Sequence, residues 1–154
     1  MSSAEIKHDF LDPPAENGSA DYLGTIGPYR VIRELGKGGM GYVFLAEDVR
    51  LKREVALKVM TQKIAATPGS RKRFISEARS MAAVHHDNVA TIFEVGEYKG
   101  TPYMAMELLE GSTLESLAEV EQRPDYAEVI RYARDMARGL AAAHAQGIVH
   151  RDIK

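Results

Sequence analysis

The sequence contains no cysteine among its 154 residues, which excludes disulfide bonds and thiolate metal sites. No stretch approaches the roughly 20 apolar residues that a membrane-spanning helix needs. The first residues also lack the apolar segment of a secretory signal peptide. A net charge of -2 gives no reason to expect nucleic acid or an anionic membrane as a partner. We therefore expect a soluble cytoplasmic protein, with a membrane anchor downstream left open.

The order of the predicted elements indicates the fold class. Residues 1–26 are rich in small, polar and turn-forming residues without periodicity, which predicts a disordered polar tail. Strand-like segments then cluster early and helical segments late, which predicts an α+β fold with an antiparallel sheet. The predicted strands cover residues 29–35, 42–48, 53–60, 89–97 and 102–108, and the predicted helices cover residues 71–84, a short stretch from Thr113, and residues 125–146. Asp125 with Glu128 forms a capping-box pattern, and Gly147 is a natural stop for the last helix.

A glycine cluster follows the first predicted strand. Gly36, Gly38 and Gly41 have the spacing G-x-G-x-x-G, and Val43 comes two residues later. Glycines at this density let backbone amides approach phosphate oxygens with no side chain in the way. The next segment is strand-like, whereas a dinucleotide-binding fingerprint would continue into a helix. The cluster therefore predicts a hairpin tip bent over phosphate groups, and a plain glycine-rich turn is the alternative for the motif taken alone.

A lysine and a glutamate lie at positions that favour an ion pair. The period of two along the third predicted strand places Lys58 on the same face as a small alanine. On the following helix, Glu77 falls between Val84 and Met81 within an apolar arc. Because burial of an unpaired carboxylate costs several kcal/mol, we expect Glu77 to pair with Lys58. The alternative is that both side chains reach solvent.

Several motifs in register resemble those of a protein kinase. The glycine loop, "VALK" at residues 55–58, the helix glutamate and "HRDIK" at residues 150–154 resemble the family's signature motifs. "HHDNV" at residues 85–89 and "MELLEGSTL" at residues 106–114 resemble its H-P-N-I segment and its hinge. The residues of these motifs are most similar to those of bacterial serine/threonine kinases of the eukaryotic type. The resemblance implies a five-stranded antiparallel N-lobe with one regulatory helix, followed by the first helices of a helical C-lobe.

The resemblance also implies a domain organisation. After the tail, residues 27–106 would form the N-lobe with its ATP-binding glycine loop. Residues 107–154 would form the hinge and an incomplete helical C-lobe that ends in the catalytic loop.

The resemblance implies a role in catalysis or nucleotide binding for each residue that matches a kinase motif. Lys58, paired with Glu77, would hold the α- and β-phosphates of ATP. Asp152 would orient the substrate hydroxyl and accept its proton, and Lys154 would steady the γ-phosphate, a pattern typical of serine/threonine kinases. Met106 would be the gatekeeper. The implied nucleotide-binding residues are Leu35, Gly36, Gly38, Gly39, Gly41, Val43, Ala56, Lys58, Met106, Glu107 and Leu109.

The family's two metal-holding positions, the catalytic-loop Asn and the Asp of D-F-G, lie beyond residue 154 in the family pattern. The resemblance therefore implies ATP and Mg²⁺ as cofactors but no metal ligand within this sequence. Because such groups act as a unit, we expect this chain alone to bind ATP and to be catalytically incomplete. The implied activity of the family is phosphoryl transfer to serine or threonine hydroxyls of a protein substrate.

Two alternatives to a catalytic kinase stay open: a pseudokinase-like module that binds nucleotide, and a module that docks on a kinase. The last predicted helix carries an apolar stripe that would pack against helices beyond the catalytic loop. We expect that stripe to be exposed and to offer a surface for self-association or a kinase dimer. His144 falls within the stripe and is predicted to be a packed histidine. The stripe consists of Val129, Ala133, Met136, Ala137 and Leu140.

Overall fold

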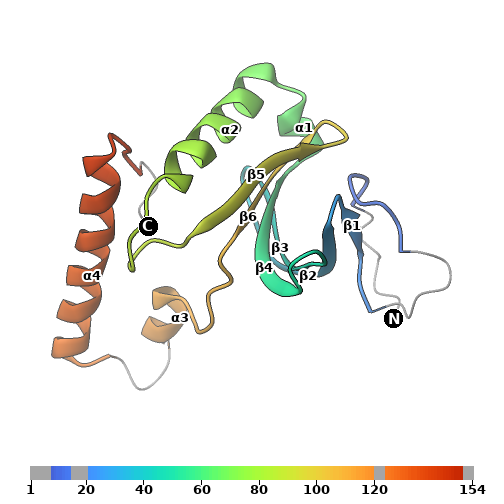
Figure 1. The fold of residues 1–154 in the computed structure, drawn as a ribbon. Coiled ribbons are helices and arrows are strands. Elements are labelled where there is room, and N and C mark those ends of the chain that lie inside the picture. The colour runs from blue at the N-terminus through green and yellow to red at the C-terminus, as the bar shows by residue number, and fades with distance from the viewer. Residues whose placement is uncertain (1–7, 15–20, 120–123, 151–154) are drawn as a thin grey trace.

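The computed structural model describes residues 8–14, 21–119 and 124–150. Six strands form a single sheet, and helix α2 packs across it (Figure 1). Helix α4 and strand β1 lie at opposite ends of the molecule. The strands are β1 (Gly24–Ile26), β2 (Tyr29–Gly38), β3 (Gly41–Asp48), β4 (Arg53–Met60), β5 (Ile92–Tyr98) and β6 (Thr101–Met106). The helices are α1 (Gln62–Ala65), α2 (Pro68–Ala82), α3 (Leu114–Glu119) and α4 (Tyr126–Ala145).

The sheet has the order β1-β2-β3-β4-β6-β5, and all its strand pairs are antiparallel. The predicted α+β class and the antiparallel sheet are confirmed. The predicted number of five strands is wrong, because Gly24–Ile26 adds a sixth strand inside the segment predicted to be a disordered tail. Three residues are too few for a period of two to be recognised in the sequence. Phe10, also within that segment, is only 9% exposed and belongs to the core.

The two faces of the sheet carry different kinds of side chain. The register pairs Phe44 with Leu57 and Leu57 with Ala105, so these three residues share one face, which holds the larger apolar core. The opposite face packs against α2, whose buried residues are Phe74 and Ala78. Strand β4 is therefore covered on both sides, and its buried residues Val55, Ala56, Leu57, Val59 and Met60 surround a half-buried Lys58.

Helix α4 begins and ends at the predicted signals. The Asp125 carboxylate accepts a hydrogen bond from the Glu128 N–H at 2.8 Å, and the Glu128 carboxylate accepts one from the Asp125 N–H at 3.2 Å. These two bonds form the predicted capping box. At the other end Gly147 has a φ of 73°, and its N–H donates to the His144 carbonyl at 2.9 Å. A positive φ at this position is the usual glycine termination of a helix.

The apolar face of α4 is exposed in the described part of the chain, as the sequence predicts. Val129 and Met136 are each 49% exposed, whereas Gly139 is buried. A Cβ at Gly139 would lie 2.5 Å from the Asn88 carbonyl oxygen, so the helix approaches the loop between α2 and β5 at this glycine. His144 is exposed, and its prediction as a packed core residue is wrong. No element within the described ranges covers the face on which it lies.

A polar network joins the turn after β3 to the edge strand β5. The Glu94 carboxylate accepts hydrogen bonds from Tyr29 at 2.9 Å, from Tyr103 at 2.6 Å and from Arg50 at 2.8 Å. Burial opposes ionisation of Glu94, but these three donors outweigh it and keep its pKa below its ordinary value. Burial and the neighbouring Glu94 raise the pKa of Tyr103 to about 12. Asp48, 1% exposed, accepts from both the side chain and the backbone N–H of Arg50.

Asp48→Asn is expected to lower the free energy of unfolding at pH 7 by about 1–3 kcal/mol, because hydrogen bonds to a charged acceptor are lost. The hydrogen bond from Arg50 holds the pKa of Asp48 below 3.8 in the folded protein. Its stabilising effect is therefore complete above pH 3.8 and is lost as the pH falls through the folded pKa. Urea unfolding at several pH values from 7 to 3 should show the difference between variant and wild type shrink in acid. A difference that is constant over this range would contradict this role for Asp48.

Candidate functional site

The glycine cluster forms the tip of the β2–β3 hairpin. Gly38 pairs with Gly41, so Gly39 and Met40 make the turn, and Gly36 pairs with Val43 farther down the stem. A Cβ added at Gly36, Gly38 or Gly39 would meet nothing within 4 Å. The space beside the backbone at these three glycines is therefore open.

Gly41 is a glycine for a different reason. A Cβ at this position would lie 1.9 Å from the Val59 carbonyl oxygen, which belongs to the backbone of β4 and cannot move aside. The third glycine of the motif thus fixes the tip of the hairpin against the strand that carries Lys58. Glycine serves in this motif both for open backbone and for close strand packing.

Lys58 lies in the middle of β4, on the face opposite the larger core. It is paired with Val43 of β3 on one side and with Met104 of β6 on the other. Its neighbour on that face, Ala56, is paired with Met106 and is 8% exposed. The ammonium group thus emerges from a half-buried position beside the stem of the glycine hairpin. The predicted residues Val43, Ala56, Lys58 and Met106 are brought to one face by the register alone.

The residues after β6 present backbone groups at the edge of this face. The Glu107 N–H donates to the Thr91 carbonyl at 2.8 Å, and the Glu107 carboxylate accepts from the Thr91 N–H at 3.0 Å. This reciprocal pair fixes the segment as it leaves the sheet. Leu109, two residues on, is 67% exposed, and Leu35 on the other side of the face is 40% exposed. Both apolar side chains are thus exposed rather than packed in a core. Thr91 was not predicted from the sequence, since a lone threonine before a strand carries no signal.

The predicted ion pair between Lys58 and Glu77 is absent. Both residues are described, and neither a hydrogen bond nor an ion pair joins them; Glu77 is exposed on α2. The prediction of an inward Glu77 is wrong because Val84 lies beyond the end of α2 at Ala82. When Val84 is left out, the buried stripe is centred on Phe74 and Ala78, away from Glu77.

The two catalytic-loop predictions, Asp152 and Lys154, lie outside the described residues. Within those residues, no group of three or more His, Asp or Glu side chains could hold a metal ion. Over the same ranges, no helix is long and apolar enough to cross a membrane.

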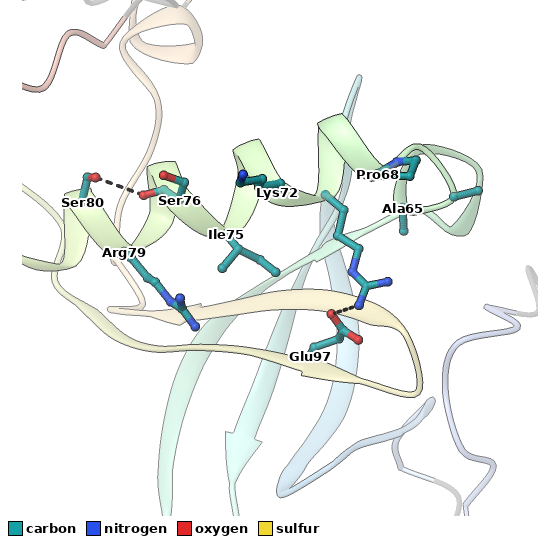
Figure 2. Close-up of a pocket in the computed structure, with 10 residues that line it drawn as sticks. Ala65, Pro68, Lys72, Ile75, Ser76, Arg79, Ser80 and Glu97 are labelled. Carbon is teal, nitrogen blue, oxygen red and sulfur yellow. Dashed lines mark hydrogen bonds and ion pairs between the residues drawn. The ribbon is translucent and has the colours of Figure 1, made fainter.

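Two hollows in the described part of the chain are lined by residues other than Lys58. A groove of about 750 Å³ runs along α2 beside β5, and Figure 2 shows Lys72, Arg79 and Ile75 on its wall. An Arg71–Glu97 ion pair of 2.5 Å joins α2 to β5 in this groove. The second, of about 470 Å³, is lined by the loop after α2 and by Glu107.

Comparison with known families and proteins matches residues 29–154 to the protein kinase domain. Serine/threonine-protein kinase pkn2 of Myxococcus xanthus is 40% identical over 134 residues, which cover 87% of this chain and 16% of that protein. Serine/threonine-protein kinase PrkC of Bacillus subtilis is 37% identical over 128 residues, which cover 83% of this chain and 20% of that protein. The crystal structure of the Mycobacterium tuberculosis PknI kinase domain has a TM-score of 0.74 at 29% identity, with 89% of this chain and 55% of that chain covered.

The chain belongs to the protein kinase domain family, and the similar bacterial proteins are serine/threonine kinases. Its sheet and α2 correspond to the N-lobe of that fold, and α3 and α4 to the start of the C-lobe. The chain spans 16% and 20% of the length of these two curated relatives and 55% of the solved kinase domain.

Because Lys58 and Glu77 are apart in the structure, we expect no energetic coupling between them in the protein without ligand. A double-mutant cycle of Lys58→Met and Glu77→Gln, followed by urea unfolding, should give a coupling free energy within about 0.5 kcal/mol of zero. Because Glu77 is exposed, Glu77→Gln alone should change the free energy of unfolding by no more than about 0.5 kcal/mol. A coupling free energy above about 1 kcal/mol would mean that the pair forms in solution without a ligand.

Proposed function

We propose that the protein binds ATP at the face that carries Lys58 and that, as part of a complete kinase domain, it supports transfer of the γ-phosphate to serine or threonine hydroxyls of proteins. The observation that supports this most is the register that sets Lys58 beside the stem of an open glycine hairpin. A cation without an ion-pair partner in the described residues lies next to backbone that has room for phosphate oxygens.

The residues present fit a nucleotide. Ala56 and Val43 lie on the same face as Lys58, and their small apolar side chains would contact the flat adenine ring. The backbone carbonyl of Glu107 and the N–H of Leu109 would meet the polar edge of adenine. Gly36, Gly38 and Gly39 would cover the phosphates. ATP supplies the transferable phosphoryl group when it is bound.

Phosphoryl transfer depends on positioning and charge neutralisation. Lys58 would neutralise the α- and β-phosphates, and Asp152 would orient the acceptor hydroxyl and take its proton. Lys154 would steady the γ-phosphate. Glu77 would hold Lys58 in place only after α2 brings it toward β4, since the two side chains are apart in the described structure. The family holds Mg²⁺ with the catalytic-loop Asn and the Asp of D-F-G, which follow the catalytic-loop Asp, and we propose that these 154 residues alone bind ATP without turning it over.

Lys58→Met is expected to weaken ATP binding by about tenfold or more, because one charge-assisted contact to phosphate is lost. Binding of adenosine, which has no phosphate, should change little. Isothermal titration calorimetry with both ligands measures the difference. Lys63→Met serves as a matched control, since Lys63 is an exposed lysine on α1 and is not among the residues predicted to bind the nucleotide.

Two results would contradict this proposal. Equal ATP affinity in wild type and Lys58→Met would remove Lys58 from the phosphate site. Transfer of γ-phosphate to the chain itself or to a basic protein, abolished by Lys58→Met, would show that the 154 residues are catalytically sufficient.

A further inference from the structure

Residues 8–12 lie against the sheet, although the sequence predicts a disordered tail there. Residues 8–12, here called the N-terminal strap, are held at both ends. Asp12 forms a bridge with Thr25 of β1, with N–H···O distances of 3.0 and 2.8 Å. The Asp12 carboxylate also accepts a hydrogen bond from the Tyr98 hydroxyl at 2.6 Å and forms an ion pair with Lys99 at the β5–β6 turn.

The other end of the strap packs on the stem of the glycine hairpin. The His8 side chain is 5% exposed, and its ring centre lies 4.7 Å from that of Tyr42 and 5.0 Å from that of Phe44, both edge-on. Its Nε2 is 3.8 Å from a carboxylate oxygen of Glu34 on β2. Phe10, two residues on, also contacts Tyr42 and Phe44. Burial outweighs the opposing effect of Glu34 and holds the pKa of His8 below 6.5.

The geometry of Gly24 shows that the strap fits closely. A Cβ at Gly24 would lie 2.5 Å from the Asp12 carbonyl oxygen and 2.9 Å from the Leu11 Cβ. The strap therefore lies directly against β1 at a position that a larger residue would block. Its docking is part of the fold rather than a loose surface contact.

The strap and the nucleotide face are on opposite sides of the same hairpin. Tyr42 and Phe44 alternate with Val43, so they point away from the face that carries Lys58. The hairpin tip has few contacts of its own, because Gly36, Gly38 and Gly39 are open and Met40 is 53% exposed. Beyond the stem, the tip is held by a hydrogen bond from the Thr61 N–H to the Met40 carbonyl at 3.3 Å and by Gly41 against β4. The position of the tip thus depends on what supports the stem.

We propose that the N-terminal strap supports the glycine hairpin from behind, so that His8 and Phe10 are positioning residues for the phosphates of the nucleotide. This inference rests on the proposed ATP-binding function. A hairpin already held in place loses less conformational entropy when phosphate binds, which strengthens binding without any contact between strap and ligand. Loss of the strap should therefore weaken ATP binding more than adenosine binding, because the hairpin tip, which has the fewest other contacts, covers the phosphates.

The test uses the full chain with His8→Ala, Phe10→Ala and Asp12→Ala, one at a time. Hydrogen exchange of the backbone amides of residues 36–42 should become at least about tenfold faster in each variant, since local opening of the hairpin becomes easier. The dissociation constant for ATP should rise about three- to tenfold, and that for adenosine should stay within about twofold. Phe93→Ala is the matched control, because Phe93 is a half-exposed aromatic residue on β5, where it stacks with Arg53 rather than with the strap.

The outcomes separate the strap from the proposed function. Failure of the unaltered chain to bind ATP would contradict the proposed function, while hairpin exchange would still report on the strap. Unchanged exchange at residues 36–42 would overturn the inference whatever the nucleotide result. Faster exchange with equal losses for ATP and adenosine, or with no loss, would also overturn it. If Phe10→Ala unfolds the chain, His8→Ala and Asp12→Ala decide the matter, because they leave Phe10 in the core.

Discussion

The register of β4 between β3 and β6 is the constraint on which the rest of the site depends. Leu57 and Val59 face the larger core and have no exposed surface, so Lys58 between them must face the other way. A slip of one residue would put the Lys58 ammonium into an apolar core, at a cost of several kcal/mol. The same register sets Ala56 and Met106 on the lysine's face. The hydrophobic core thus fixes the position of the charged group, and the glycine hairpin follows because Gly41 rests directly on Val59.

Helix α2 is the element whose position separates the observed structure from a catalytic arrangement. Its inner side is held by Phe74 and Ala78, and the Arg71–Glu97 ion pair holds its first turns to β5. These contacts leave Glu77 in solvent. An inward Glu77 requires a shift of the helix over the sheet. Under the proposed function, the free energy for this shift would come from contacts with Lys58 and bound phosphates. A bound ligand can drive such a shift only by its differential affinity for the two positions.

Most of the fold follows from local patterns in the sequence, and the failures have physical causes. Strands of five or more residues, the capping box at Asp125 and the stop at Gly147 were predictable because each depends on neighbouring residues. The orientation of Glu77 was not, because it depends on where α2 ends. Strand β1 was missed because it has only three residues. The docking of residues 8–12 depends on partners far along the chain, such as Tyr42 and Lys99, and a short polar segment gives no periodic signal of such contacts. The placement of Lys58 on the same face as Ala56 was predictable because it follows from the period of two along the strand.

The central claim is that ATP binds across the glycine hairpin and the segment after β6. The most direct measurement is a two-dimensional amide NMR titration of the chain with ATP, with resonances assigned. The account predicts that shifts concentrate at the amides of Gly36, Gly38 and Gly39 and at Leu109, with little change along α4. Shifts spread over the groove beside α2, or an absence of shifts at the hairpin at saturating ATP, would contradict it.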